Sequence, residues 1–215
     1  MAVLENEQHQ LEAIKEWWKE YGKITLFIFL LTLAASFGWR YWQQRQVIVT
    51  EHASLIYDQM TTSFANQNHD AFVAQANKLV SEFDKTPYAN MAQFAIAHQA
   101  VKDGKFDKAL TELQLIMGQS IDPQVRQIAR VRAARVLLAQ NKLNDALKTL
   151  ETVDSEAFKP AVHEVRGDVY LAQGEAQKAR ESYKAAIAAT PPDETNRPLL
   201  EMKFEQLSQH TDNLA

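Results

Sequence analysis

An uncharged segment near the N-terminus constrains this chain more than any other feature. Residues 24–39 contain no acidic or basic side chain, and Lys23 and Arg40 flank them. A helix of that length spans about 24 Å, slightly less than the roughly 30 Å hydrocarbon core of a bilayer. The flanking cations can extend their apolar stems into the acyl region while their charges stay at the headgroups. Aromatic residues that favour the interface lie on both sides, namely Trp17, Trp18, Tyr21, Tyr41 and Trp42. We therefore expect a transmembrane helix over residues 24–42.

Two other interpretations of this segment are less favoured. A buried helix of a soluble core seldom has tryptophans clustered at both ends and cations at its limits. A cleaved signal peptide is suggested by Ala34 and Ser36, which form a small-x-small site after an apolar run. However, the preceding region is long and acidic, whereas signal peptides begin short and basic.

The basic residues around the segment predict its orientation. Lys15, Lys19 and Lys23 precede it together with the α-amino group, and Arg40 and Arg45 follow it. By the positive-inside rule this favours, by about one charge, a cytoplasmic N-terminus and a translocated C-terminal part. We expect a cytoplasmic amphipathic arm over 1–23, the anchor over 24–42 and a periplasmic domain over 43–215. The apolar face of the arm is formed by Leu4, Leu11, Ile14, Trp18 and Tyr21.

The translocated part repeats itself. The sequence of residues 104–110 recurs at 141–147 and 174–180, with a weaker copy at 66–72. A Gly or Asn stands where the first helix of each pair would stop. A period near 34 residues with this pattern resembles the tetratricopeptide repeat. A final apolar set, Leu200, Phe204 and Leu207, follows Pro198 at helical spacing and predicts a capping helix. The expected fold is all-α: a transmembrane helix, then a tetratricopeptide-like α-solenoid with a C-terminal cap.

Residues that could carry out catalysis are not grouped in this sequence. Cysteine is absent, and the histidines form no His-Glu-x-x-His pattern, so we expect neither a metal site nor thiolate chemistry. The glycines are too scattered to build a phosphate-cradling loop. The net charge of −4 gives no indication of nucleic acid as a partner. We expect a non-enzymatic protein without a cofactor.

Three sets of residues are candidates for binding. The first helices of the repeats should line an inner groove suited to unfolded or apolar segments, unless these residues belong to the core instead. A basic run should dock an acidic partner or lipid headgroups, unless it is a solvated face paired with glutamates. Small and hydroxylated residues on the anchor should contact a partner's membrane helix. The sets are Met91, Phe94, Val101, Ile128, Val131 and Leu138; Arg126, Arg130, Arg132 and Arg135; and Thr25, Thr32, Ser36 and Gly38.

The order of these parts resembles the YfgM family, the ancillary subunits of the bacterial SecYEG translocon. The resemblance begins in the acidic opening, residues 4–8, and continues through residues 11–15. It includes Gly38-Trp39-Arg40-Tyr41-Trp42 at the membrane exit and residues 53–57 after it, followed by the repeats. The most specific piece is residues 38–42 directly after the anchor.

The resemblance implies a single-pass inner-membrane protein with a periplasmic repeat domain. Its implied partners are SecYEG, the membrane-anchored chaperone PpiD, emerging secreted proteins and the lipid bilayer. The function expected on this basis is to hand emerging proteins to periplasmic chaperones. Two alternatives stay open: a scaffold for another envelope complex, and a stress-signalling regulator that acts through the cytoplasmic arm.

Overall fold

The computed structural model describes the backbone of residues 2–212, and the side chains of residue 15 and residues 17–207. The predicted apolar face of the arm therefore lies partly outside the described side chains, at Leu4, Leu11 and Ile14. Two compact units divide between His52 and Ala53. The helices are α1 (Ala2–Ala65), α2 (His69–Glu82), α3 (Pro87–Lys102), α4 (Phe106–Gln119), α5 (Pro123–Ala139), α6 (Leu143–Glu151), η1 (Glu156–Phe158), α7 (Lys159–Ala172), α8 (Ala176–Ala189) and α9 (Arg197–Asp212).

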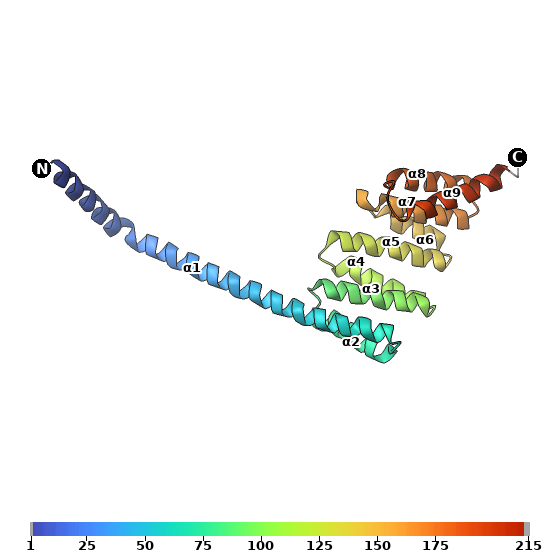
Figure 1. Ribbon diagram of the computed structural model, residues 1–215, viewed down its shortest axis with the longest axis horizontal. Helices are drawn as coiled ribbons and strands as arrows, with labels where there is room; N and C mark the ends of the chain where they lie inside the picture. The colour runs from blue at the N-terminus through green and yellow to red at the C-terminus, as the bar shows by residue number, and fades with distance from the viewer. Residues whose placement is uncertain (1, 213–215) are drawn as a thin grey trace. The chain divides into compact units, whose positions relative to one another are not determined.

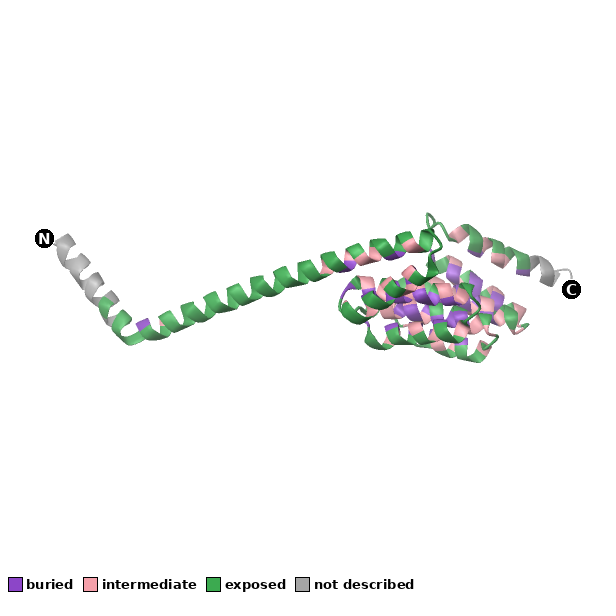
Figure 2. Ribbon diagram, turned by 90° about the horizontal axis from the view of Figure 1, so that it is seen from below, coloured by how far each residue is buried: buried purple, intermediate pink, exposed green. Residues whose placement is uncertain are grey.

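The first unit consists of the N-terminal part of α1. The stretch Trp17–Ala65 is long and apolar enough to cross a membrane, with a window of mean hydropathy 1.6. Its large apolar side chains are exposed, as the values for Phe27 (66%) and Phe37 (68%) illustrate. Figure 2 shows the described residues of this part of the helix almost entirely as exposed. A helix that is apolar on all sides and covered by no protein is suited to contact with lipid. The described residues thus contain one candidate membrane span, where the sequence predicts it.

The second unit stacks helices in consecutive pairs (Figure 1). The last turns of α1 pair with α2, and the further pairs are α3 with α4, α5 with α6, and α7 with α8, before α9 ends the array. No strand is found among residues 2–212. The prediction of an all-α chain with a helical-repeat domain and a C-terminal capping helix is confirmed.

The turn inside each pair has the same backbone form. Gln67, Gly104, Asn141 and Gly174 have φ values of 57°, 73°, 59° and 77°. The residue after each one donates its backbone N–H to a carbonyl five residues earlier; for example, Lys105 N lies 2.8 Å from Ala100 O. This is the Schellman arrangement, which satisfies the free carbonyls of a helix end through one left-handed residue. The repeated Gly/Asn positions therefore set the register of the array.

Small residues bring the paired helices together. Ala92, Ala109, Ala129, Ala146 and Ala179 are fully buried, at 0% exposure. Buried positions follow the helix surfaces that face one another, whereas the outer surfaces are exposed (Figure 2). Because alanine has no atoms beyond Cβ, helix axes can approach closely there, and larger residues fill the space between pairs.

Candidate binding groove

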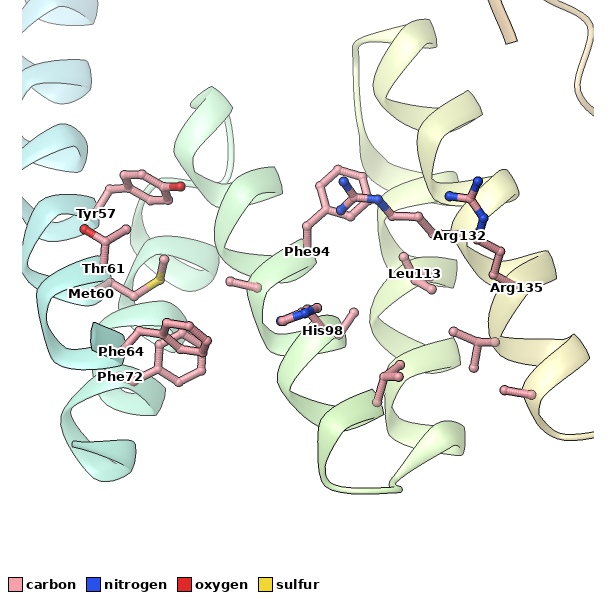
Figure 3. A pocket seen from close by; sticks show the side chains of 15 residues that line it. Tyr57, Met60, Thr61, Phe64, Phe72, Phe94, His98, Leu113, Arg132 and Arg135 are labelled. Carbon is pink, nitrogen blue, oxygen red and sulfur yellow. The ribbon is translucent and has the colours of Figure 1, made fainter. Parts of the chain in front are cut away.

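The first helices of three successive repeats form an open groove of about 610 Å³. Tyr57, Met60 and Phe64 come from α1 and Phe72 from α2 (Figure 3). Phe94 and His98 come from α3, and Arg132 and Arg135 come from α5. The lining residues are Tyr57, Met60, Thr61, Phe64, Phe72, Phe94, Ala95, Ala97, His98, Val101, Leu113, Arg132, Arg135, Val136 and Ala139.

The repeat register explains which residues line the groove. Counting back from the left-handed turn residues, the position ten residues earlier holds Tyr57, Phe94, Val131 and Glu164 in the four repeats. The position six residues earlier holds Thr61, His98, Arg135 and Asp168, and the position three residues earlier holds Phe64, Val101, Leu138 and Leu171. Equivalent positions of a regular array fall on one continuous stripe. The groove follows this stripe over the first two repeats; in the third repeat only Arg135 of the stripe lines it, together with Arg132, Val136 and Ala139.

The end of the groove formed by α1 and α2 is aromatic. The ring of Phe64 lies 5.4 Å from that of Phe72 between centroids. Phe72 and Met60 are buried, at 2% exposure each, and form the floor, whereas Phe64 remains 39% exposed. This end offers a firm apolar surface with an accessible edge.

The end formed by α5 is basic. The guanidinium of Arg132 lies 4.3 Å from the centroid of the Phe94 ring, so the cation is held over an aromatic face. Burial and the nearby charge of Arg135 hold the pKa of Arg132 below its ordinary value. Arg135 donates from its guanidinium to Glu164 Oε2 at 3.2 Å, and its side chain remains 49% exposed.

At the fourth repeat the same stripe carries acidic residues that α9 covers. Lys203 of α9 lies 2.9 Å from Asp168 Oδ1 and 3.0 Å from Glu164 Oε1. The hydroxyl of Tyr183 donates to Asp168 Oδ1 at 2.7 Å. Burial lowers the pKa of Lys203, but the hydrogen bonds to Asp168 and Glu164 outweigh it, so the pKa lies above its ordinary value. The cap therefore closes the stripe with a neutralised ionic cluster.

The six residues predicted to line a groove have three different environments. Phe94 and Val101 line it. Val131 is buried at 4% exposure in a core cluster against which Leu138 packs. Met91 is 47% exposed and Ile128 is partly buried, and neither lies among the lining residues.

The four arginines of the basic run also separate. Each residue advances the helix by about 100°, so Arg130 lies about 160° and Arg126 about 120° around α5 from Arg132. Arg126 donates to the carbonyl of Ser120 at 2.7 Å, so its side chain is bonded to the loop between α4 and α5. Arg130 is partly buried, and only Arg132 and Arg135 reach the groove.

Thr25, Thr32 and Ser36 of the predicted contact face lie on one side of α1, and Gly38 lies apart from them. The hydroxyls of Thr25 and Thr32 donate to carbonyls of their own helix, those of Tyr21 at 3.0 Å and Phe29 at 2.8 Å. Ser36 lies on the same side as these threonines, whereas Gly38 lies about 140° around the helix from Thr25. Thr32, Ser36 and Gly38 are exposed.

Several groove residues were not singled out from the sequence, namely Tyr57, Met60, Phe64, Phe72 and His98. The weak repeat copy at 66–72 contains the signal that could have identified them. Aligning Gln67 with Gly104 makes Tyr57 equivalent to Phe94 and Phe64 equivalent to Val101. The substitution of Gln for the usual Gly or Asn obscured this register.

The chain is similar to known proteins over most of its length. A family model described as a tetratricopeptide repeat-like domain matches residues 15–209. An ancillary SecYEG translocon subunit of Escherichia coli (strain K12) is 31% identical over 97% of this chain and 100% of that protein. Proteins of the same name from Aggregatibacter actinomycetemcomitans and Neisseria gonorrhoeae are 32% and 28% identical, over 86% and 96% of this chain and 91% and 100% of those proteins.

A solved structure described as the MamA RS-1 ArsTM double mutant superposes with a TM-score of 0.53. It is 15% identical in sequence, and the match covers 75% of this chain and 97% of that chain. This likeness concerns the fold alone.

Proposed function

The chain belongs to the tetratricopeptide repeat-like family of ancillary SecYEG translocon subunits, and from this membership we propose that it is a non-enzymatic accessory of the Sec translocon in the bacterial inner membrane. The observation that carries the proposal is the extent of the similarity. It includes the anchor as well as the repeats, at 31% identity over 97% of the chain. Repeat motifs alone occur in many unrelated proteins, but the combination with this anchor is specific.

In this role the two units have separate tasks. The apolar helix keeps the protein in the bilayer beside the channel, where Thr25, Thr32 and Ser36 offer a small, smooth surface to a partner's membrane helix. The repeat domain faces the periplasm and contacts emerging secreted proteins or a membrane-anchored chaperone such as PpiD. The open groove, with its aromatic floor, supports such a contact because partly folded segments expose apolar side chains.

Affinity purification of the full-length chain tests the function. Tagged protein is extracted from membranes in mild detergent, and the co-purified proteins are identified by mass spectrometry. Recovery of translocon subunits is the expected result. Recovery of another envelope complex without them would replace this proposal by the scaffold alternative.

Paired substitutions in the anchor make the purification specific. Thr32→Leu combined with Ser36→Leu alters the smooth side, and Leu30→Phe combined with Leu31→Phe alters the opposite side. We expect the first pair to lower recovery of the translocon and the second to leave it unchanged. Equal recovery from both variants would argue against this contact face.

Single cysteines test the orientation, since the natural chain contains none. Gln10→Cys and Glu205→Cys are exposed separately to a membrane-impermeant maleimide in spheroplasts. With a cytoplasmic N-terminus, only the Glu205→Cys protein reacts before the membrane is permeabilised. The reverse labelling would overturn the proposed orientation.

A further inference from the structure

The groove has an uneven distribution of charge. Among its lining residues, the ionisable side chains are those of Tyr57, His98, Arg132 and Arg135, and none is a carboxylate. The rings of Tyr57, Phe64 and Phe72 lie on α1 and α2, and the two guanidinium groups lie across the groove on α5, where Arg132 covers the Phe94 ring of α3 (Figure 3). A partner that fills this groove must therefore match an apolar surface at one end and positive charge at the other.

The charge at the α5 end is only partly compensated within the protein. Arg135 and Lys203 together face the carboxylates of Glu164 and Asp168, which balances their two charges, whereas no carboxylate among the described side chains forms a salt bridge with Arg132. Arg132 stacks on Phe94 and is partly shielded from water there. Repulsion between Arg132 and Arg135 would be relieved by an incoming anion, and an arginine held on an aromatic ring is already positioned to receive it.

The neighbouring repeat limits where that anion can lie. Beyond Arg135 the stripe carries Glu164 and Asp168, whose charges face Lys203 of the cap. An additional carboxylate placed there would meet two others and a lysine that is already engaged. The favourable position for a negative charge is thus at Arg132 and Arg135, on the groove side of the cap.

We propose that the groove binds a protein segment in which large apolar side chains are followed by a carboxylate. This inference rests on the proposed accessory role. The apolar side chains lie against Phe64 and Phe72, and the carboxylate lies at Arg132 and Arg135. Successive first helices packed 8–10 Å apart put these two ends about 16–20 Å from each other. An extended segment covers this distance with about five or six residues, and a helical segment covers it with about three turns.

Peptide binding to the full-length protein tests the proposal. The protein is held in nanodiscs of zwitterionic lipid, so that neither detergent nor anionic lipid occupies the groove. The probe is a fluorescent 14-residue peptide with Phe and Leu in its first half and Glu in its second, and a matched peptide has Lys in place of Glu. Fluorescence anisotropy should give at least tenfold tighter binding of the acidic peptide, with an affinity that falls as salt rises.

Charge reversal locates the site. Arg132→Glu should weaken the acidic peptide about tenfold or more and make the lysine peptide the preferred one, since the attraction changes sign. Arg130→Glu makes the same charge change on the opposite side of α5 and should shift either affinity by less than twofold. Equal effects of the two variants would overturn the assignment, because a general field rather than the groove would then be responsible.

The apolar end is tested with a second matched pair. Phe64→Ser removes the accessible ring of the groove, and Leu115→Ser removes a similarly exposed apolar side chain on α4. We expect Phe64→Ser alone to weaken the acidic peptide several-fold, while circular dichroism shows that both variants remain helical. No difference between them would contradict seating of the apolar half at this end.

Three further outcomes separate this inference from others. If vesicles containing phosphatidylglycerol displace the acidic peptide from Arg132, the basic end binds lipid headgroups and the inference fails. If wild-type protein recovers the translocon in the purification above but binds neither peptide, the inference fails while the accessory role stands. Peptide binding without translocon recovery would overturn the accessory role and leave the groove chemistry supported.

Discussion

The ring of Tyr183 lies where a side chain at Gly167 would have to be. A Cβ atom built on Gly167 would come within 2.5 Å of Tyr183 Cε1. Tyr183 cannot move easily, since it is 1% exposed and its hydroxyl bonds Asp168. We therefore expect Gly167→Ala to lower the free energy of unfolding by about 1–2 kcal/mol, because overpacking outweighs the gain in helix propensity. Urea denaturation followed by circular dichroism measures it.

Gly118 provides the matched control. It also lies in a helix, but a Cβ atom there would meet nothing within 4 Å. Gly118→Ala should raise the stability by about 0.5–1 kcal/mol through helix propensity alone. If both alanine variants gained stability, the Gly167–Tyr183 contact would not be the constraint that it is taken to be.

Removing the charge of Lys203 should loosen the capping helix. Lys203→Met keeps the length of the side chain but leaves the buried Glu164 and the partly buried Asp168 without their shared cation. Glu164 keeps its bond from Arg135, and Asp168 keeps that from the Tyr183 hydroxyl. We therefore expect a loss of about 1.5–3 kcal/mol, the usual contribution of hydrogen bonds to a charged group. The exposed Lys184→Met on α8 controls for the loss of one positive charge, and the difference is measured at pH 7.

Neutralising the partner should restore part of that stability. In the double variant Lys203→Met with Glu164→Gln, the less exposed of the two carboxylates is neutralised together with the loss of its cation. The double variant should therefore be more stable than the sum of the two single changes predicts. Strict additivity would indicate that the ionic cluster contributes nothing as a unit.

His163 should make the stability depend on pH below neutrality. Burial, together with Arg166 and Lys159, holds the pKa of His163 below its ordinary 6.5. The unfolded chain then takes up a proton at higher pH than the folded one, so the stabilisation is present above pH 6.5 and is lost as the pH falls through the folded pKa. The stability difference between wild type and His163→Gln should decline from pH 7.5 to pH 5.

Chemical denaturation of both proteins across this range measures that trend. His52→Gln, at an exposed position, controls for the removal of one imidazole. A difference between wild type and His163→Gln that stays constant with pH would contradict the linkage.

Removing a glycine at one turn should lower the stability, and introducing a glycine at another turn should raise it. Gly104 has a φ of +73°, which an L side chain adopts only with strain, so Gly104→Ala should cost about 1–2 kcal/mol. Gln67 already has a φ of 57°, and Gln67→Gly should gain about 0.5–1 kcal/mol by relieving that strain. Thermal unfolding measures both, and a loss on Gln67→Gly would argue against this turn geometry.

Much of the fold can be predicted from local sequence. The anchor is evident because residues 24–39 contain no charge. The pairing of helices is evident because a Gly or Asn recurs at the turns of the last three pairs, at Gly104, Asn141 and Gly174. Leu200, Phe204 and Leu207 predict the capping helix, and Leu200 and Leu207 are buried there. These features depend on residues near one another in the chain, which is why a periodic pattern captures them.

The candidate groove was only partly predictable. Phe94 and Val101 line it, but Val131 holds the same register position as Phe94 and is buried in the core. Sequence periodicity identifies a face of a helix but not how deeply the neighbouring helices cover it. The difference between Arg130 and Arg132 has the same origin, since two residues along a helix lie on nearly opposite sides.

The sequence by itself determined that the chain is a membrane-anchored helical-repeat protein, because hydrophobicity, helix-stopping residues and repeat spacing act locally. Only the tertiary structure decided where the candidate groove begins and ends. Tyr57 and Arg135 line the same groove although 78 positions separate them in the chain, and Lys203 closes the stripe by binding Asp168. Such contacts arise from the stacking of whole helices, so their partners are set by the geometry of the array and not by any local pattern.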